Sequence, residues 1–451
     1  MAWDSLSHAT LFCAEDSAIW QSEPVQRPRM VSVLDRPISL AVALSVVLCV
    51  LLGSQISAFP FAPVAGLAGL ALLPGLLSYV RRFRLMPSLL ALLGLSVIAG
   101  LVLTGLREDT HTVSMQAAFA RSIIVVSLMG GIAVVLFARV HIGTAATGIA
   151  YGVGMVISIA LEPLSTVNPW RFSLSIPITV LILAVLAVWN RLTSQVIALL
   201  LLGVIGILND ARSNSAILFL AAVVLIWQRL ARAVSNGRRH AGHVLGLALF
   251  AAGFVLLMQF SLLEGYFGEA SQAKSEAQIA TSGNLLLGGR PEAAASMALI
   301  ARYPLGLGGG LLPTGADVTA AKTAMLAIGY DPDNGYVQNF MFGTGVEVHS
   351  VLGDFWLWFG LAGLAACLVM AATFVMNAEH HLRNATLTGL MAYLSLRFFW
   401  DLLFSPPTSG ATLLALAVPL AALLVPRGAG REPADGWSPE SDERIGSAAS
   451  R

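Results

Sequence analysis

Long apolar stretches separated by short polar turns fill most of this chain. A helix that crosses a membrane needs roughly 17 to 25 mostly apolar residues, and about twelve stretches have that character. They run over residues 38–57, 60–79, 86–106, 118–138, 142–161, 173–189, 193–209, 215–231, 244–262, 351–376, 385–404 and 409–425. The pattern predicts an all-α polytopic membrane protein with about twelve transmembrane helices.

Basic residues at the ends of these stretches predict the orientation, because Lys and Arg are retained on the cytoplasmic side of a membrane. With the N-terminus in the cytoplasm, the internal loops hold ten arginines. The short external loops hold three, which are Arg107, Arg171 and Arg212. This bias places both chain ends in the cytoplasm. The tail after Pro426 is rich in Gly, Ser, Pro, Glu and Asp, which predicts disorder.

One connection is far longer than the others and falls on the periplasmic side. Residues 263–350 hold eight acidic and four basic residues, including both lysines of the chain. Loops of this length are more often functional than unstructured, so short helices are expected at about 291–302 and 317–328. The run Leu305 to Gly310 and the sequence Asp331-Pro-Asp-Asn-Gly favour turns over a phosphate loop or a cation site.

The predicted organisation has five parts. They are a cytoplasmic tail (1–37), helices one to nine (38–262), the periplasmic loop (263–350), helices ten to twelve (351–425) and a disordered cytoplasmic tail (426–451). The first apolar stretch resembles a signal peptide but is long enough to span, which favours an uncleaved anchor. Met30 is an alternative start, in which case residues 1–29 lie outside the protein.

Composition supports the membrane assignment and excludes other classes. The chain is 57% hydrophobic and 11% charged, with a net charge of +1 and a mean hydropathy of +0.78. Soluble domains carry about 25% charged residues, so a large soluble core and nucleic-acid binding through a basic surface are both excluded. Cys13, Cys49 and Cys367 lie in the N-terminal tail and in two apolar stretches, which argues against a disulfide framework.

Polar residues at the external ends of membrane helices are where function is expected. Arg212 lies in the turn 209–215, where a guanidinium fork could hold two phosphate oxygens or simply balance Asp210. His349 comes directly before the tenth helix, where an imidazole can act as a general base at neutral pH. An ordinary interfacial histidine is the alternative. Glu347 could orient the ring, although helical geometry would put it on another face.

Five further residues are weaker candidates. Arg290 and Arg302 are the only arginines of the long loop, where a cation could stabilise a departing diphosphate. For Arg302, a solvated helix face is the favoured interpretation. Arg397 and Asp401 are spaced to pair within the membrane or to line a cavity, and Arg121 is of the same kind.

Taken together, these features resemble the O-antigen ligase and polymerase family, membrane glycosyltransferases of the GT-C type. The resemblance covers most of the chain and includes the long loop between helices nine and ten. His349-Ser350 is followed by nine residues and then Gly360, as in the family. Gly289-Arg290, an alanine-rich helix and Pro304 to Gly308 resemble a second family pattern, and Asp210 to Ser215 a third. Ala216 departs from it, because family members often have leucine there.

The resemblance implies a role for three of these residues. Arg212 and Arg290 would bind the diphosphate of a lipid-linked donor, and His349 would activate or position the acceptor hydroxyl. No metal, nucleotide or other cofactor would be needed, because the glycosyl-diphosphate bond supplies the energy.

The expected function is that of a bacterial inner-membrane glycosyltransferase with its active site facing the periplasm. It would use undecaprenyl-diphosphate-linked oligosaccharide to polymerise exopolysaccharide or O-antigen repeat units. One alternative is an O-antigen ligase that transfers the finished glycan to lipid A-core. The other is a transporter or flippase of lipid-linked sugars, with Arg121, Arg397 and Asp401 along its path. Expected partners are the lipid-linked donor, a glycan or lipid A-core acceptor and a chain-length regulator, but no nucleic acid.

Overall fold

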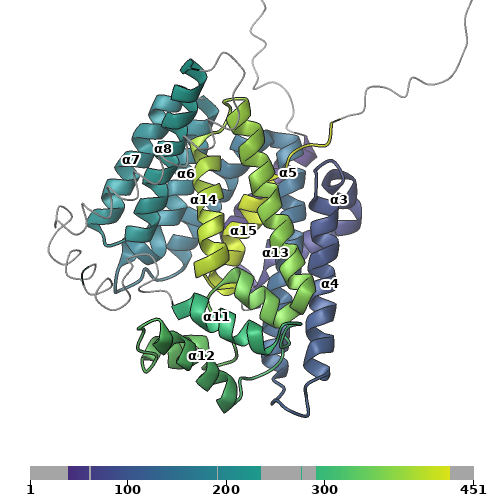
Figure 1. Ribbon diagram of the computed structural model, residues 1–451. Coiled ribbons are helices and arrows are strands. Elements are labelled where there is room, and N and C mark those ends of the chain that lie inside the picture. The colour runs from purple at the N-terminus through teal and green to yellow at the C-terminus, as the bar shows by residue number, and fades with distance from the viewer. Residues whose placement is uncertain (1–38, 60–61, 190, 235–275, 277–290, 427–451) are drawn as a thin grey trace, which may run out of the picture. The chain divides into compact units, whose positions relative to one another are not determined.

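The computed structural model describes residues 39–59, 62–189, 191–234, 276 and 291–426 (Figure 1). The chain divides into two units, Met1–Ser39 and Leu40–Arg451, and the description below concerns the second. Both predicted tails lie largely outside the described residues, as do the ninth apolar stretch (244–262) and the first part of the long loop.

Helices make up nearly all of the described chain. They are α1 (Leu40–Gly53), α2 (Val64–Ala71), α3 (Leu73–Val80), α4 (Met86–Gly105), α5 (Met115–Leu161), η2 (Trp170–Leu174), α6 (Ser175–Trp189), α7 (Leu192–Leu208), α8 (Arg212–Val234), α11 (Pro291–Arg302), α12 (Gly315–Ala327), η3 (Tyr336–Met341), α13 (Val351–Arg383), α14 (Gly389–Phe404) and α15 (Pro407–Ala421). Two very short antiparallel strands, β1 (Ser57–Phe59) and β2 (Ala62–Pro63), follow α1. The expected all-α class is therefore confirmed for the described residues.

Five stretches of helix within the described residues are long and apolar enough to cross a membrane. They are Met86–Gly105, Met115–Leu161, Trp170–Trp189, Arg212–Ala231 and Val351–Arg383. Shorter apolar helices include Leu40–Gly53, Leu192–Leu208 and Pro407–Ala421. Helices of this length and composition are those of a membrane-embedded protein, while the count of twelve crossings stays a prediction.

Helix α5 forms the centre of the bundle and consists of two limbs. Gly143 has a φ of 79°, which breaks the helical path between the apolar stretches predicted at 118–138 and 142–161. Only glycine adopts this conformation readily, so the reversal is placed at Gly143. The two limbs pack against α1, α2, α3, α4, α6 and α15.

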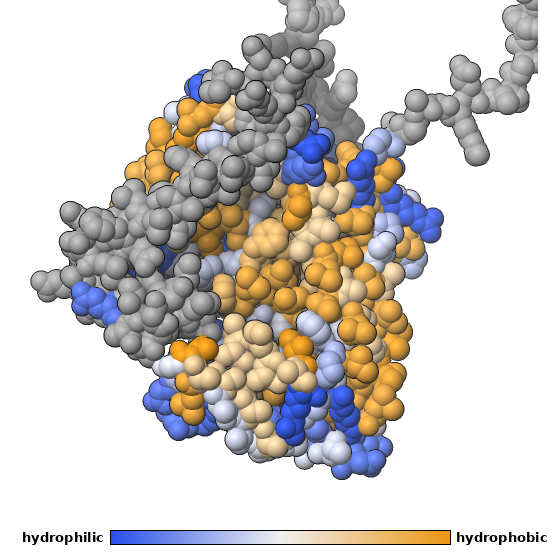
Figure 2. Space-filling model, viewed as in Figure 1, coloured by the Kyte–Doolittle hydropathy of each residue, from blue (hydrophilic) through white to orange (hydrophobic). Residues whose placement is uncertain are grey.

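The outward faces of α4 and α13 are apolar and exposed. Leu95, Ile98 and Val102 on α4 and Leu361 and Leu368 on α13 are each more than half exposed. Figure 2 shows hydrophobic side chains over this face, with hydrophilic ones gathered toward its upper and lower ends. An extended apolar surface of this kind suits contact with lipid.

Helices α11 and α12 occupy the two segments where the long loop was predicted to be helical. Pro291 begins α11, a position where the missing N–H costs nothing. Thr314 and Asp317 form a capping box at the start of α12, in which each side chain meets the other residue's backbone N–H. Helix α11 contacts α12, α13 and α14, and the pair lies at one end of the bundle (Figure 1).

The glycine run of the loop packs against a break in α13. Gly360 has a φ of 63° and interrupts the helix, which leaves the Leu357 carbonyl to accept hydrogen bonds from the N–H groups of Leu307 and Gly308 at 2.7 and 3.0 Å. The backbones are so close that a Cβ at Gly306 would lie 2.6 Å from the Cα of Gly360. The run is thus a close-packed turn, as predicted, and it is built against a helix break.

The aromatic segment at the start of α13 is enclosed within the fold. Phe355, Trp358 and Phe359 are each only 1% exposed. Trp358 donates its indole N–H to the carbonyl of Val346 at 2.6 Å. These rings are enclosed because the glycine run and the segment before α13 fold over them.

Candidate functional site

The backbone at His349 is held in an unusual conformation. His349 has a φ of 59°, which is uncommon for a residue other than glycine and is a feature of functional sites. The N–H groups on either side of it, those of Val348 and Ser350, donate to the carboxylate of Asp354 at 2.6 and 3.2 Å. Asp354 is fully buried. This carboxylate therefore fixes the turn that presents the imidazole.

The ring of His349 is held by a tyrosine and a glutamate from the long loop. Nδ1 lies 2.7 Å from the Tyr336 hydroxyl, which donates to Glu292 Oε1 at 2.9 Å. Because that hydroxyl has one proton and gives it to Glu292, the neutral imidazole carries its own proton on Nδ1. Nε2 has no hydrogen bond to a side chain of the described chain. These three residues are called the His349 cluster below.

Burial sets the charge state of His349. Removal from water lowers the pKa of the imidazole below its usual range, and a backbone hydrogen bond with Phe340 partly offsets that shift. The ring is therefore neutral near pH 7, which is the state in which Nε2 can accept a proton.

The residues beside His349 tie it to two helices of the bundle, α14 and α15. Glu347 accepts a hydrogen bond from Thr408 at the start of α15, with 2.7 Å between the oxygens. Ser350 donates to the Leu402 carbonyl near the end of α14 at 3.1 Å. Burial raises the pKa of Glu347, against the lowering effect of Thr408 and Arg121. Glu347 thus anchors the turn, and Tyr336 has the orienting role considered for it.

Arg212 begins α8 and lies in a different part of the bundle. Its Nε is 3.5 Å from Asp210 Oδ1, so the pairing with Asp210 is present, and the Arg212 side chain is still 26% exposed. Two residues later, Asn214 accepts a hydrogen bond from Tyr393 of α14 at 2.9 Å. Helix α14 therefore connects with the Arg212 segment through Tyr393 and with the His349 segment through Leu402.

Arg397 and Asp401 form the ion pair expected from their spacing. Arg397 Nε lies 2.9 Å from Asp401 Oδ2, and Ser405 donates to the other carboxylate oxygen at 2.6 Å. Tyr393 and Arg397 are four residues apart and share a face of α14. Because Tyr393 contacts Asn214, Arg397 lies on the face of α14 that meets the start of α8.

Arg121 connects parts of the fold to one another. It is 6% exposed and donates to the carbonyls of Gly309 at 2.5 Å and Val346 at 3.1 Å. Its guanidinium carbon lies 4.7 Å from the centre of the Trp358 ring. Arg121 thus holds the glycine run and the segment before His349 against α5.

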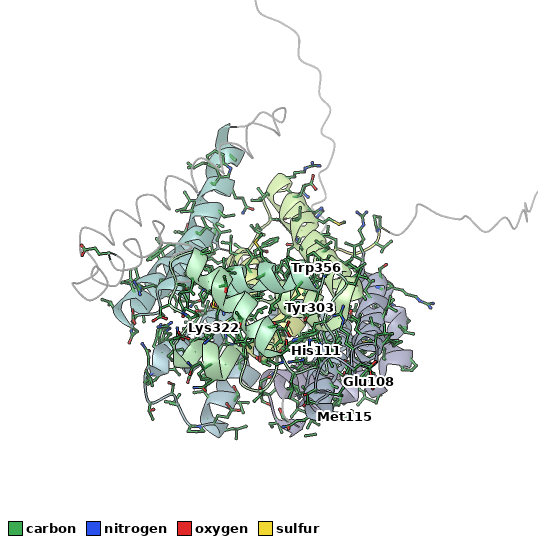
Figure 3. All side chains as sticks on the ribbon, turned by 60° about the horizontal axis from the view of Figure 1, so that its bottom comes forward. Glu108, His111, Met115, Tyr303, Lys322 and Trp356 are labelled. Atoms are coloured by element: carbon green, nitrogen blue, oxygen red, sulfur yellow. The ribbon has the colours of Figure 1, made fainter. Side chains whose placement is uncertain are left out.

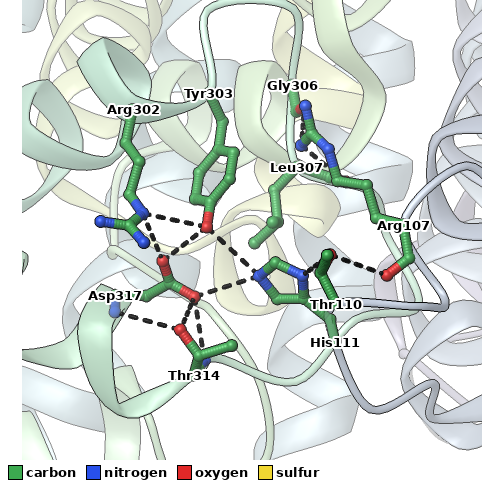
Figure 4. A network of polar contacts seen from close by, with 9 residues as sticks. All are labelled: Arg107, Thr110, His111, Arg302, Tyr303, Gly306, Leu307, Thr314 and Asp317. Atoms are coloured by element: carbon green, nitrogen blue, oxygen red, sulfur yellow. Dashed lines mark hydrogen bonds and ion pairs between the residues drawn. The ribbon is translucent and has the colours of Figure 1, made fainter.

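Arg302 belongs to a second polar cluster at the far end of α11 (Figure 4). Its Nε lies 3.0 Å from Asp317 Oδ1 and 3.1 Å from the Tyr303 hydroxyl. The same hydroxyl donates to Asp317 at 2.6 Å, and His111 Nε2 lies 3.2 Å from both groups. These four residues are called the His111 cluster below. The preference for a solvated position at Arg302 agrees with its exposure, because the side chain is 45% exposed, although its Nε also pairs with the fully buried carboxylate of Asp317.

The His111 cluster joins the α4–α5 connection to the long loop. His111 precedes α5, Tyr303 follows α11 and Asp317 lies in the first turn of α12. Figure 3 shows Tyr303 and His111 close together at this end of the bundle. Burial raises the pKa of Asp317, but hydrogen bonds from Tyr303 and Thr314 outweigh it, and the net shift is downward.

Other predicted features have simpler outcomes. Arg290 lies outside the described residues. The turn at residues 331–334 is present, with Asp331 Oδ1 accepting from the Asp333 N–H at 3.0 Å and Lys322 2.7 Å from Asp333. Neither finding adds a group to the His349 cluster.

The sequence singled out His349 as a candidate but gave no sign of the residues that hold its ring. Tyr336 and Glu292 lie 13 and 57 positions earlier in the chain, and no spacing rule connects them. Asp354 carried a usable signal, because an acidic residue in the first turn of an apolar helix is costly unless it is satisfied locally.

Comparison with known proteins gives no match: no family model, no curated protein and no solved structure is similar to this chain.

Proposed function

We propose that the chain is a membrane glycosyltransferase that polymerises exopolysaccharide or O-antigen repeat units from an undecaprenyl-diphosphate-linked oligosaccharide. One observation carries the proposal. A half-buried, neutral imidazole is held at Nδ1 by Tyr336 and Glu292, while Nε2 has no side-chain partner among the described residues. That arrangement suits a general base directed at a hydroxyl group.

In the proposed reaction, Nε2 of His349 takes the proton of the acceptor hydroxyl. The acceptor oxygen bonds to the anomeric carbon of the donor as the bond from that carbon to the diphosphate oxygen breaks. The imidazolium is stabilised by the Tyr336 and Glu292 chain, and Arg212 stabilises the charge on the departing diphosphate. Arg290, outside the described residues, is the second proposed diphosphate ligand.

The proposed setting is the bacterial inner membrane, with about twelve crossings and the 263–350 loop in the periplasm. Three features support it. Five helices of the described residues are long and apolar enough to cross, the arginine bias favours an external position for the loop, and His349 lies just before α13. The His349 cluster would then lie at the periplasmic membrane–water interface, where the diphosphate of a lipid-linked donor is located.

Ligation to lipid A-core uses the same chemistry and differs only in the acceptor. Transport of lipid-linked sugars does not require a general base. The pair Arg397–Asp401 is already satisfied by Ser405 and by each other, and Arg121 binds backbone carbonyls. These contacts favour structural roles over a transport path.

The test is the length distribution of undecaprenyl-linked glycans in a deletion strain complemented with variants. His349→Asn removes the base, and Asn tolerates the positive φ at this position. His111→Asn makes the same change in the other cluster and serves as the matched control, while Arg212→Ala tests the diphosphate contact. Protein abundance in the membrane is measured alongside.

Polymerase activity predicts single repeat units accumulating on the carrier in His349→Asn and Arg212→Ala, with long chains retained in His111→Asn. Long chains stranded on the carrier would instead identify a ligase. Unchanged carrier-linked pools in both point variants at normal abundance would refute glycosyl transfer and favour transport.

A further inference from the structure

A cavity of about 370 Å³ is lined by Thr408 together with thirteen other residues. Its walls come from the end of α1, the short strands, both limbs of α5 and the start of α15. Pockets for small ligands usually measure about 300 to 1,000 Å³, so this one is large enough for one or two sugar rings.

Polar groups line this cavity although they lie among apolar helices. Gln55 Oε1 accepts a hydrogen bond from Thr412 at 2.5 Å, and its amide nitrogen donates to the Leu52 carbonyl at 2.6 Å. Tyr151 donates to the Thr412 carbonyl at 2.6 Å. The amide and hydroxyl groups are therefore held in fixed positions on the cavity wall, and these hydrogen bonds offset the cost of placing them among apolar helices.

The charge of the lining separates this cavity from a phosphate site. Among the described residues that line it there is no arginine, lysine or histidine, and the single charged group is the carboxylate of Glu162. A diphosphate would be repelled, since its binding needs cations or clustered N–H donors. An uncharged ligand rich in hydroxyl groups matches an amide, several hydroxyls and one acceptor carboxylate.

Thr408 connects the cavity to the His349 cluster. It lines the cavity, and its hydroxyl donates to Glu347, two residues before His349, at 2.7 Å. The wall of the cavity and the turn that presents the imidazole are therefore joined by one hydrogen bond.

We propose that this cavity binds an uncharged sugar unit of a glycan, a hexose or an N-acetylhexosamine. This deepens the proposed function and rests on it, because the glycan would be the acceptor or growing chain of the transfer at His349. The donor diphosphate binds elsewhere, at the arginines.

The experiment uses the full chain in lipid nanodiscs with free sugars as probes. Saturation-transfer NMR measures binding of glucose, galactose and N-acetylglucosamine, with glucuronate as the anionic comparison. Ala411→Leu fills the cavity, and Thr412→Val removes the hydroxyl that holds Gln55. Thr319→Val is the control, since the exposed Thr319 hydroxyl bonds only to its own helix at Gly315. Each variant is checked for an unchanged thermal unfolding midpoint.

At least one neutral sugar is expected to bind to wild type, to Thr319→Val and to the catalytically silent His349→Asn. Glucuronate should bind more weakly, and affinity should fall about tenfold in Ala411→Leu and Thr412→Val. Equal binding in all variants, stronger binding of glucuronate, or no sugar binding at all would overturn the inference.

The two proposals fail in different ways. Loss of transfer in His349→Asn without any sugar binding leaves the proposed function standing and refutes the cavity. Sugar binding that depends on Thr412, together with normal transfer in His349→Asn, supports the cavity and refutes the proposed catalytic role.

Discussion

The two histidine clusters lie at opposite ends of α11 and hold their rings in different ways. Glu292 in the first turn serves the His349 cluster, and Tyr303, just after the last turn, serves the His111 cluster. Glu292 and Tyr303 are eleven positions apart, which corresponds to roughly 17 Å along a helix. In His111 both ring nitrogens have side-chain partners, Thr110 on Nδ1 and Asp317 and Tyr303 on Nε2.

The difference separates a structural histidine from a candidate base. His111 is 9% exposed, and both nitrogens of its ring have hydrogen-bond partners. Its role is therefore to hold the α4–α5 connection against the long loop. His349 has one nitrogen held and the other without a side-chain partner in the described chain. Its backbone also adopts a costly conformation, which His111 does not share.

The largest expected effect is on catalysis. His349→Asn should lower the rate of glycan transfer at least about 100-fold, because a general base contributes 10² to 10⁴ in rate. His111→Asn should keep transfer within a few-fold of wild type. Initial rates with purified protein and a lipid-linked donor measure both variants. Equal losses of rate in the two variants would contradict the assignment of a catalytic role to His349 and a structural role to His111.

Next in size is an effect on stability at the His111 cluster. Asp317→Asn should cost about 1 to 3 kcal/mol, since buried donors from Tyr303 and His111 lose their charged acceptor. Thermal unfolding in detergent measures it, with Asp333→Asn as the exposed control.

The stabilising effect of Asp317 should depend on pH in a defined direction. Because the folded pKa of Asp317 is lowered, its contribution is present above the unfolded pKa of about 3.9. It is lost as the pH falls through the folded value. The difference in unfolding midpoint between wild type and Asp317→Asn should therefore shrink toward low pH, and a constant difference would contradict the assignment.

A smaller effect is expected when the two tyrosines are exchanged for phenylalanine. Tyr336→Phe removes one hydrogen bond to His349, worth about 1 kcal/mol, and should slow transfer about fivefold with little change in the unfolding midpoint. Tyr303→Phe should instead lower the unfolding midpoint and leave the rate of transfer nearly unchanged. Initial rates and thermal unfolding measure the two effects. Slower transfer in Tyr303→Phe with a normal unfolding midpoint would show that the two clusters are not functionally distinct.

The smallest effect concerns the acid limb of activity. Burial lowers the pKa of His349, so transfer should stay active as the pH falls and lose half its rate below the usual imidazole value of about 6.5. Initial rates across pH 5 to 8 measure the midpoint. A midpoint above 6.5 would mean that the working imidazole is exposed or paired with an anion.

Much of the local structure could be predicted from the sequence. Pro291 at a helix start and the Thr314–Asp317 capping box follow from local rules, and both loop helices lie where they were expected. His349 stood out as a candidate because a polar residue at the edge of an apolar stretch is conspicuous, and its role stays a prediction. The spacing of Arg397 and Asp401 gave their ion pair directly.

What was missed depends on contacts between distant segments. Tyr336 reaches His349 only because η3 folds back beside the start of α13, and Trp358 is buried only because the loop covers it. Arg302 pairs with Asp317 because α11 and α12 pack together. Helical periodicity reports which face is apolar, but it does not report which distant polar group will meet that helix.

The contact between Gly306 and Gly360 has a consequence for natural variation. Neither position has room for a side chain, since each would drive a Cβ into the other's backbone or that of Leu305. A substitution at either position would therefore disturb the backbone at the other. Among relatives of this chain, both glycines should persist as a pair or be replaced in the same lineages, and independent drift at either one should be rare.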